Sequence, residues 1–304
     1  CGQFPAVGSQ WLAHGLGTLV SPGRQRMDWF EQLTGFRETD YASTVDRPEV
    51  RDGFLISRVN GRKVGIGHLA LRSLADLRVA SAHMLGGGPR TQVRCVSGDA
   101  RSLHCMPAHA GALFQVASQF NLLEMISPNV TPEQGVTRYA HDATQGPACA
   151  IAAGGGTIYR NYFAPVNGIP GQTATRQINA LAALGDMLSE SMDCTTRSLW
   201  EMRNGYALCT PDGLRAIGKH LRSASPSGMD YLRGALAIGL HSQVEVTDTT
   251  APSRHCVTQA YCSALPVAYT RIPAPDWVPF AQLVLEAAYE ATLLAAAEQR
   301  HAGG

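Results

Sequence analysis

The fold is decided by residues 113–163, which read LFQVASQFNLLEMISPNVTPEQGVTRYAHDATQGPACAIAAGGGTIYRNYF. Residues 113–117 form an apolar run with the length of a buried strand, and the chain becomes polar just after it, at Asn121. The segment 118–170 is rich in Gly, Pro, Asn, Thr and Gln, so it cannot be one long element. Within it, the small residues 148–153 favour a short helix. A long irregular segment inside a compact domain is usually functional, so we expect the site here.

Strand and helix patterns alternate on both sides of this run. Residues 53–67 predict a hairpin around Asn60-Gly61, and residues 199–209 contain a second Asn-Gly pair, which is the strongest two-residue hairpin signal. Thr210 and Pro211 suit the N-cap and the first position of a helix. The other expected strands are 92–96, 235–240, 242–246 and 256–262, and the expected helices are 27–33, 174–190, 210–221 and 277–297.

This alternation predicts the α/β class with a mixed sheet. The strands 113–117 and 257–261 are both apolar, and each is followed by a polar loop. We therefore expect both to be central strands that end at one shared cleft.

The composition restricts the class of function. The chain has 304 residues, of which 45% are hydrophobic, and this length is at the upper end for one compact domain. Only 16% of the residues are charged and the net charge is +1, so bulk electrostatics attracts neither nucleic acid nor an anionic membrane. This balance favours an enzyme that acts on small molecules or on groups attached to proteins.

The cysteines indicate a reducing compartment. The chain has eight of them, irregularly spaced and without a CxxC pair, which argues against a disulfide framework. No apolar stretch reaches the length that a membrane span needs, and we expect a cytoplasmic protein. Cys1 is an unusual first residue. A trimmed chain explains it most simply, and an acylated lipoprotein cysteine or a revealed catalytic N-terminus are the alternatives.

A glycine triplet lies near the end of the decisive run. Residues 154–156 are Gly-Gly-Gly and precede Thr157. Consecutive glycines let backbone N–H groups approach an anion closely. Thr157 and Asn161 could hold a ribose, and the rings of Tyr159 and Tyr162 could stack on a base. A flexible turn is the plainer interpretation of the triplet alone.

The order of strand, asparagine, acidic stretch, small residues and glycines resembles the macrodomain and poly(ADP-ribose) glycohydrolase superfamily. The string TPEQG…YAHDATQGPACAIAAGGGTIYRNYF resembles its MavL-type branch of arginine-specific ADP-ribosyl hydrolases, and VTQAYCSALPVAY (257–269) resembles the second ligand-lining loop of that fold. The resemblance implies a three-layer α/β/α sandwich with a mixed central sheet over residues 91–304, with residues 1–90 as an N-terminal extension packed on it. It implies ADP-ribose or an ADP-ribosylated protein as the partner, and no cofactor or metal.

The chain departs from the family at two points. Gln119-Phe120-Asn121 stands where ordinary macrodomains have Asn-Ala-Ala-Asn, and the adjacent Gln-Glu-Glu of the glycohydrolases is missing. The usual catalytic residue of those branches therefore cannot be transferred to this chain.

The candidate catalytic residues are Asp142, Glu133 and Glu124, which fall where the resembling branch carries its acidic cluster. Hydrolysis of an ADP-ribosyl arginine passes through an oxocarbenium-like state, as glycoside hydrolysis does. One carboxylate can orient the guanidinium and another can handle a proton, so several acids near the ribose would serve this reaction. Each acid also has a structural interpretation: Glu133 as a first-turn helix acid, Glu124 as a solvated residue, and Asp142 as an N-cap or Asx-turn residue. Asp142 is our first choice.

The expected ligand-binding residues surround these acids. Asn121 is expected to orient the proximal ribose through its amide. The diphosphate is expected against the glycine triplet and the loop 263–267, because both are dense in backbone N–H groups. The full set is Asn121, Gln145, Gly154, Gly155, Gly156, Thr157, Tyr159, Asn161, Tyr162, Ser263, Ala264, Leu265, Pro266 and Val267.

Two other functions compete with an arginine-specific ADP-ribosyl hydrolase, and one metal site needs consideration. A macrodomain that reads ADP-ribose without cleaving it is the main alternative, although a reader needs no acids at the ribose. An enzyme that processes NAD or a nucleotide sugar on an unrelated α/β fold would need a GxGxxG after its first strand, and we find none. His104, Cys105 and His109 suggest zinc, but their spacing matches no structural zinc pattern and a second ligand pair is missing.

Overall fold

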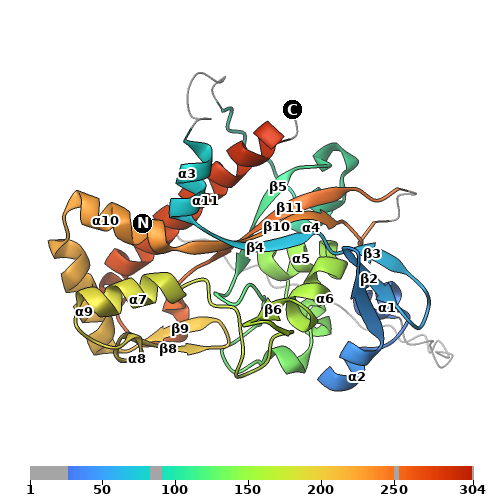
Figure 1. Ribbon diagram of the computed structural model, residues 1–304, viewed down its shortest axis with the longest axis horizontal. Helices are drawn as coiled ribbons and strands as arrows, with labels where there is room; N and C mark the ends of the chain where they lie inside the picture. Colours follow the sequence, from blue (N-terminus) through green and yellow to red (C-terminus); the bar gives the residue numbers. More distant parts are fainter. Residues whose placement is uncertain (1–26, 83–90, 250–252, 303–304) are drawn as a thin grey trace, which may run out of the picture.

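A mixed four-stranded sheet with the order β4-β10-β11-β5 forms the centre of the protein (Figure 1). The computed structural model describes residues 27–82, 91–249 and 253–302. β10 (Ala237–Glu245) pairs antiparallel with β4 (His68–Ser73) and β11 (Cys256–Ser263), whereas β5 (Leu113–Ser118) runs parallel to β11. The predicted α/β class with a mixed sheet is confirmed. β11 lies inside the sheet as expected, but β5 is an edge strand, so its prediction as a central strand is wrong.

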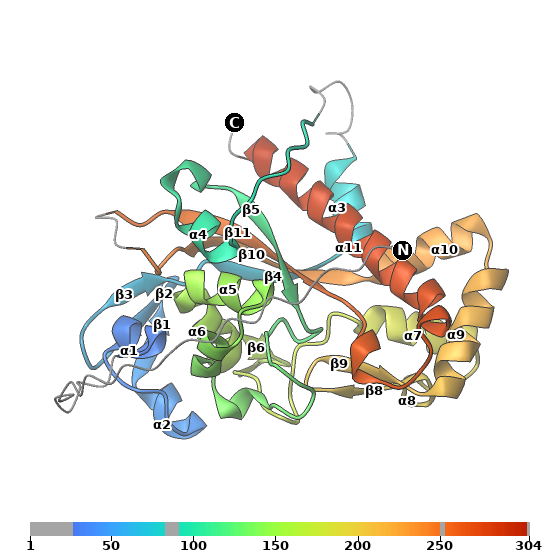
Figure 2. The ribbon, with the colours of Figure 1, turned by 180° about the vertical axis from the view of Figure 1, so that it is seen from behind.

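Helices cover both faces of this sheet (Figures 1 and 2). α11 (Ala274–Ala302) and α3 (Leu74–Ser81) pack together on one face, and α5 (Gln145–Ala152) and α6 (Gly154–Tyr162) lie on the other. α11 is amphipathic, and Phe280, Val284 and Ala287 on its inner face are fully buried. The three-layer α/β/α sandwich is therefore confirmed as the architecture.

The sheet takes one outer strand from the N-terminal part of the chain. β4 and α3 fall within residues 1–90, which the resemblance assigned to an extension. β4 pairs with β10 from Ser73 to His68, and Leu74 and Leu77 are buried in the main core. The boundary at residue 90 is therefore wrong, because β4 and α3 belong to the layers of the sandwich itself.

Two groups of smaller elements flank the sandwich. The first belongs to the N-terminal region and contains a three-stranded antiparallel sheet: α1 (Trp29–Thr34), α2 (Tyr41–Asp46), β1 (Pro48–Arg51), β2 (Phe54–Ser57) and β3 (Lys63–Gly65). The second contains a hairpin and four helices: α7 (Ala182–Ser191), α8 (Thr196–Leu199), β8 (Trp200–Arg203), β9 (Tyr206–Cys209), α9 (Pro211–Ser223) and α10 (Pro226–Ala235). The remaining elements are α4 (Ala100–Cys105), β6 (Pro165–Val166), β7 (Ile169–Pro170) and the 3₁₀ turns η1 (Pro107–His109), η2 (Pro132–Gln134), η3 (Thr137–His141) and η4 (Val267–Tyr269).

Local sequence signals predicted several of these elements well. Both Asn-Gly hairpins are confirmed, as β2–β3 and β8–β9. Thr210 caps α9 by accepting a 2.9 Å hydrogen bond from the Gly213 N–H. Two predictions fail: residues 92–96 form no strand, and the helix expected over 174–190 begins only at residue 182. Cys1 lies outside the described residues.

The glycine triplet is helical, so its prediction as an anion-binding loop is wrong. Gly154, Gly155 and Gly156 form the first turn of α6 and are buried. A Cβ atom at Gly155 would lie 2.6 Å from Val64 Cγ1, and one at Gly156 would lie 2.4 Å from Val244 Cγ2. The missing side chains therefore let α6 pack directly against β3 and β10, and the glycines serve close packing.

One helix of the described chain is long and apolar enough to cross a membrane. It covers residues 274–300 of α11, and half of its most apolar window is buried inside the protein. Its buried face packs against α3, α9 and the sheet. Length and composition alone are weak evidence for a membrane span, since a core helix has the same properties.

Candidate functional site

A pocket lies beyond the end of β5. β5 and β11 end side by side, with Ser118 and Ser263 paired in the parallel ladder. The pocket has a volume of about 620 Å³, which suits a small-molecule site. Its walls come from the end of β5, two loops, the start of α5, β9 and η4. The lining residues are Ala117, Ser118, Gln119, Glu124, Met125, Ile126, His141, Asp142, Ala143, Thr144, Gln145, Gly146, Pro147, Tyr206 and Tyr269. We call this the acidic pocket, after Glu124 and Asp142.

Two of the three candidate acids, Glu124 and Asp142, share the acidic pocket. Asp142 is half-buried, and its Oδ1 accepts a 2.9 Å hydrogen bond from the Thr144 N–H in an Asx turn. Glu133 does not line the pocket: its Oε1 accepts a 2.8 Å bond from the Ala174 N–H instead. The structure therefore places a pair of acids in the pocket rather than the expected three.

Glu124 is a buried carboxyl held by an arginine. Its side chain is 1% exposed, and its Oε1 lies 3.2 Å from Arg160 Nη2. Burial raises the pKa of Glu124 to about 7, although the neighbouring Arg160 and Tyr139 both lower it. The other oxygen, Oε2, is buried and has no hydrogen-bond partner among the described residues. A carboxyl with a pKa near 7 can carry a proton at physiological pH and act as a general acid.

This raised pKa predicts a stability that falls with pH. The folded protein keeps a proton on Glu124 from its ordinary pKa, near 4.5, up to about 7, whereas the unfolded chain releases it. The free energy of unfolding should therefore decrease by about 1–3 kcal/mol as pH rises through this window. Urea denaturation between pH 4 and pH 8 measures the slope, which should be shallower in Glu124→Gln because glutamine does not ionise. Equal slopes in the two proteins would contradict the raised pKa.

The amino end of α5 forms one wall of the acidic pocket. Thr144 is the N-cap residue of α5, but its side chain makes no capping hydrogen bond. A Cβ atom at Gly146 would lie 2.2 Å from the Ala117 carbonyl oxygen and 3.2 Å from Glu124 Cγ. The absent side chain therefore lets the helix start approach both β5 and Glu124. A helix N-terminus with backbone N–H groups facing a pocket is suited to an anion.

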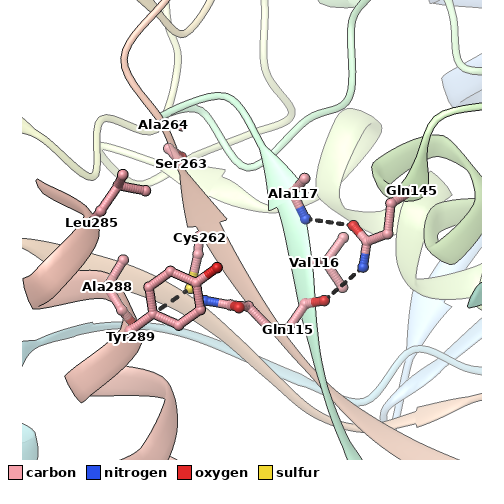
Figure 3. A pocket seen from close by; sticks show the side chains of 10 residues that line it. All are labelled: Gln115, Val116, Ala117, Gln145, Cys262, Ser263, Ala264, Leu285, Ala288 and Tyr289. Atoms are coloured by element: carbon pink, nitrogen blue, oxygen red, sulfur yellow. Dashed lines mark hydrogen bonds between the residues drawn. The ribbon is translucent and has the colours of Figure 1, made fainter. Parts of the chain in front are cut away.

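The Gln145 side chain links the start of α5 to β5 by hydrogen bonds to the unpaired edge of that strand. Its Oε1 accepts a 2.8 Å bond from the Ala117 N–H, and its Nε2 donates a 2.7 Å bond to the Gln115 carbonyl. Figure 3 shows both bonds. The side-chain amide thus fills the place that the backbone of a neighbouring strand would take. Gln145 was expected to bind ADP-ribose, and it does line the pocket.

Figure 3 shows a second pocket, which Gln145 also lines. It has a volume of about 330 Å³ and shares Ala117 and Gln145 with the acidic pocket. Leu285 and Tyr289 of α11 line it opposite the ends of β5 and β11, and the Tyr289 side chain is 58% exposed. We call it the apolar pocket. The remaining lining residues are Gln115, Val116, Cys262, Ser263, Ala264 and Ala288.

Asn121 does not line either pocket. It is fully buried, its Nδ2 donates a 2.9 Å bond to Gln177 Oε1, and its Oδ1 accepts a 3.1 Å bond from the Leu123 N–H. These bonds hold the loop after β5 against the segment before α7. The structure therefore gives Asn121 a structural role and not the expected position at a ribose.

The expected ligand residues of α6 also lie outside both pockets. Thr157 donates to the Ala150 carbonyl, Asn161 donates to the Pro132 carbonyl, and Tyr162 donates to Glu38. Tyr159 is half-buried and packs against the core cluster around α1. These side chains, like Gly154–Gly156, hold α6 in place. Their expected contacts with a ribose, a base and a diphosphate are not supported.

The loop after β11 is divided between the site and the core. Ser263 and Ala264 line the apolar pocket, as expected. Leu265 and Pro266 are buried, and the Val267 N–H is bonded to the Leu265 carbonyl. These last three residues therefore support the loop and line neither the acidic nor the apolar pocket.

Four residues of the site were missed by the sequence interpretation. Tyr206 and Tyr269 pack edge to face, with ring centroids 5.0 Å apart, in the wall of the acidic pocket. Arg160 pairs with Glu124, and Tyr289 lies in the apolar pocket. Tyr206 follows the predicted Asn204-Gly205 turn and Arg160 lies in the run 113–163, so both residues belong to segments that the sequence analysis had singled out. No local pattern shows that either residue meets an acid or a pocket.

The His104 region contains no metal site in the part of the chain that the structure describes. His104 is fully buried, with Nδ1 2.6 Å from the Ala100 carbonyl and Nε2 3.2 Å from Gln259 Nε2. Its ring also stacks on Phe114, at 3.7 Å between centroids. Both ring nitrogens are thus engaged within the protein.

No family model, curated protein or solved structure matches the chain. The chemistry of the two pockets is therefore the feature of the protein that indicates a function.

Proposed function

We propose that the protein is a hydrolase that releases ADP-ribose from arginine side chains of proteins. The observation that supports this most is the pairing of Asp142 with the buried Glu124 in one pocket, beside the amino end of α5. A cationic guanidinium leaving group needs carboxylates around it, and one of them must handle a proton.

In this proposal, the two pockets take the two ends of ADP-ribose. The acidic pocket would take the proximal ribose and the guanidinium, and the apolar pocket would take the adenine against Tyr289. The diphosphate would lie between them, at the start of α5, where backbone N–H groups favour negative charge. This arrangement replaces the glycine triplet as the diphosphate site.

The two acids have different environments, which suggests different roles. Glu124 has a raised pKa and would donate its proton to the leaving guanidine nitrogen as the bond to ribose C1 breaks. Asp142 is more exposed and would accept a proton from the water that adds to C1. The products are ADP-ribose and an unmodified arginine.

The test is a comparison of three linkages. Peptides that carry ADP-ribose on arginine, serine or glutamate are incubated with the protein, and the released ADP-ribose is quantified. We expect release from arginine only. Tight binding of ADP-ribose without release from any peptide would favour a reader module instead, and absence of both would contradict the proposal.

Tyr289→Ala should weaken ADP-ribose binding. Stacking of an aromatic side chain on a base contributes about 1–3 kcal/mol, so Kd should rise roughly tenfold or more. Calorimetry with ADP-ribose measures this, and ribose 5-phosphate, which lacks the base, should bind with unchanged affinity. Tyr231→Ala is the matched control, since Tyr231 is 73% exposed on α10. An unchanged Kd for ADP-ribose would contradict the placement of the adenine base in the apolar pocket.

A further inference from the structure

Arg160 is fully buried, and each nitrogen of its guanidinium has a polar partner within the protein. Its Nη2 lies 3.2 Å from Glu124 Oε1 and donates a 3.1 Å bond to Thr157 Oγ1. Its Nε donates a 3.1 Å bond to the Leu122 carbonyl. Its plane lies over the Tyr261 ring, with Cζ 4.0 Å from the ring centroid. Burying this charge is costly unless it is paired, and Glu124 is its only carboxylate partner among the described residues.

His241 completes this arrangement as a neutral acceptor. Its Nε2 lies 2.5 Å from the Ile66 carbonyl oxygen, which can only accept a hydrogen bond. Nε2 therefore carries the ring proton and donates a hydrogen bond to this oxygen. Its Nδ1 is therefore free to accept from Arg160 Nη1, at 3.3 Å. Burial and the neighbouring Arg160 lower the pKa of His241 to about 3, which keeps the ring neutral. Arg160 thus has a fixed position and a fixed charge.

Only one oxygen of Glu124 is engaged by Arg160. A bidentate pair would occupy both carboxylate oxygens, but here the ion pair joins Nη2 to Oε1 alone. Oε2 has no partner among the described residues, and Glu124 lines the acidic pocket. The two oxygens of the carboxyl are therefore chemically distinct.

We propose that Arg160 is a positioning residue, which fixes Oε1 of Glu124 and reserves Oε2 for proton transfer to the leaving guanidine. This inference rests on the proposed function. In the reaction, the Oε2 proton moves to the guanidine nitrogen as its bond to C1 breaks, and water adds to C1. Asp142 takes the proton from that water, and exchange with solvent returns one proton to Glu124 and removes one from Asp142.

The charged and titratable groups around Glu124 come from several elements. Arg160 of α6 lowers its pKa, and so does Tyr139 of η3, whose hydroxyl accepts a 3.1 Å hydrogen bond from the Glu124 N–H. Loss of the Arg160 charge should therefore raise the pKa of Glu124 above that in the wild type. The remaining neighbours are Cys149 of α5, Tyr261 of β11, His241 of β10 through Arg160, and Asp142 in the same pocket.

The experiment compares Arg160→Met, which removes the charge, with Arg160→Lys, which keeps it. The kcat of each variant is measured against pH on an ADP-ribosyl-arginine peptide, and folding is checked by circular dichroism. For Arg160→Met we expect kcat to fall about 10- to 100-fold, with the alkaline limb of the profile shifted up by about one pH unit or more. For Arg160→Lys we expect a similar fall in kcat with little shift of the limb. KM should be unchanged in both.

A second readout does not depend on activity. The Glu124 carboxyl is titrated by carbon-13 NMR in glutamate-labelled protein, with Glu124→Gln identifying the signal. Its pKa should rise in Arg160→Met, and an unchanged pKa would overturn the inference even if the wild type cleaves no ADP-ribosyl arginine.

Controls separate positioning from a general loss of stability. Arg72→Met removes a partly exposed ion pair with Glu298 and should change neither kcat nor the alkaline limb. If Arg160→Met does not fold, Arg160→Lys carries the test, and full kcat in that variant would contradict the proposal.

Discussion

Asp142→Asn is expected to lower kcat for release of ADP-ribose from arginine by a factor of about 10²–10⁴. The amide cannot accept the proton of the attacking water, and it offers the guanidinium no negative charge. The Asx turn is expected to persist, because the asparagine Oδ1 can still accept the hydrogen bond from the Thr144 N–H, which is 2.9 Å long in the wild type. The melting temperature and the Kd of ADP-ribose should therefore change little.

Two further variants make this result specific. Asp142→Ala removes the turn as well as the charge, so it should lose activity to the same extent and also some stability. Asp212→Asn is the matched control, since Asp212 pairs with Arg215 on the exposed surface of α9. Single-turnover kinetics on the arginine-linked peptide gives the rates. If a folded Asp142→Asn protein kept the wild-type kcat, Asp142 would not be catalytic, and its only role would be to form the Asx turn.

Gly156→Ala should have the second large effect, on folding. A Cβ atom there would lie 2.4 Å from Val244 Cγ2 and 2.8 Å from His241 Cε1. Val244 is fully buried on β10 and its β-branched side chain has little rotamer freedom, so the helix or the strand must shift. Overpacking of this kind typically costs about 1–3 kcal/mol, and we expect the upper end of that range.

Gly234→Ala is the matched control for this substitution. Gly234 is also a buried helical glycine, but the nearest atom to its added Cβ is Ala75 Cβ at 3.5 Å, an ordinary contact. Alanine there should stabilise α10 by up to about 1 kcal/mol. Urea denaturation of both variants measures the difference. A Gly156→Ala protein of wild-type stability that no longer binds ADP-ribose would restore the glycine triplet as an anion site.

Some elements of this protein are specified by neighbouring residues alone, whereas others depend on residues far away in the sequence. Asn204-Gly205 and Thr210-Pro211 specify a turn and a helix start through their own backbone geometry, so neighbouring residues were enough. The glycine triplet permits either a loop or a helix. Its state is decided by Val64 and Val244, which lie far away in the sequence. The Asp52-Gly53 turn between β1 and β2, where both residues have positive φ, is a local signal of the same kind.

The candidate site was predictable to a similar degree. Asp142 and Glu124 lie in the quoted run, and the ends of β5 and β11 were expected to meet. Glu133 was wrongly grouped with them, because its partner is a backbone N–H at residue 174. Tyr289 belongs to a helix whose pattern indicates only an inner and an outer face. That this outer face lines one pocket with the end of β5 depends on how α11 packs on the sheet, which no local pattern contains.

The two hydrogen bonds between the Gln145 side chain and β5 also affect how the protein behaves at high concentration. An edge strand with unpaired amide and carbonyl groups is a template for pairing with another chain. Gln145 occupies the Ala117 N–H and the Gln115 carbonyl, so an incoming strand would have to displace a side chain that is already bonded at both ends. Gln145 therefore blocks strand pairing at the end of the β5 edge, although β5 itself contains neither a charged residue nor a proline.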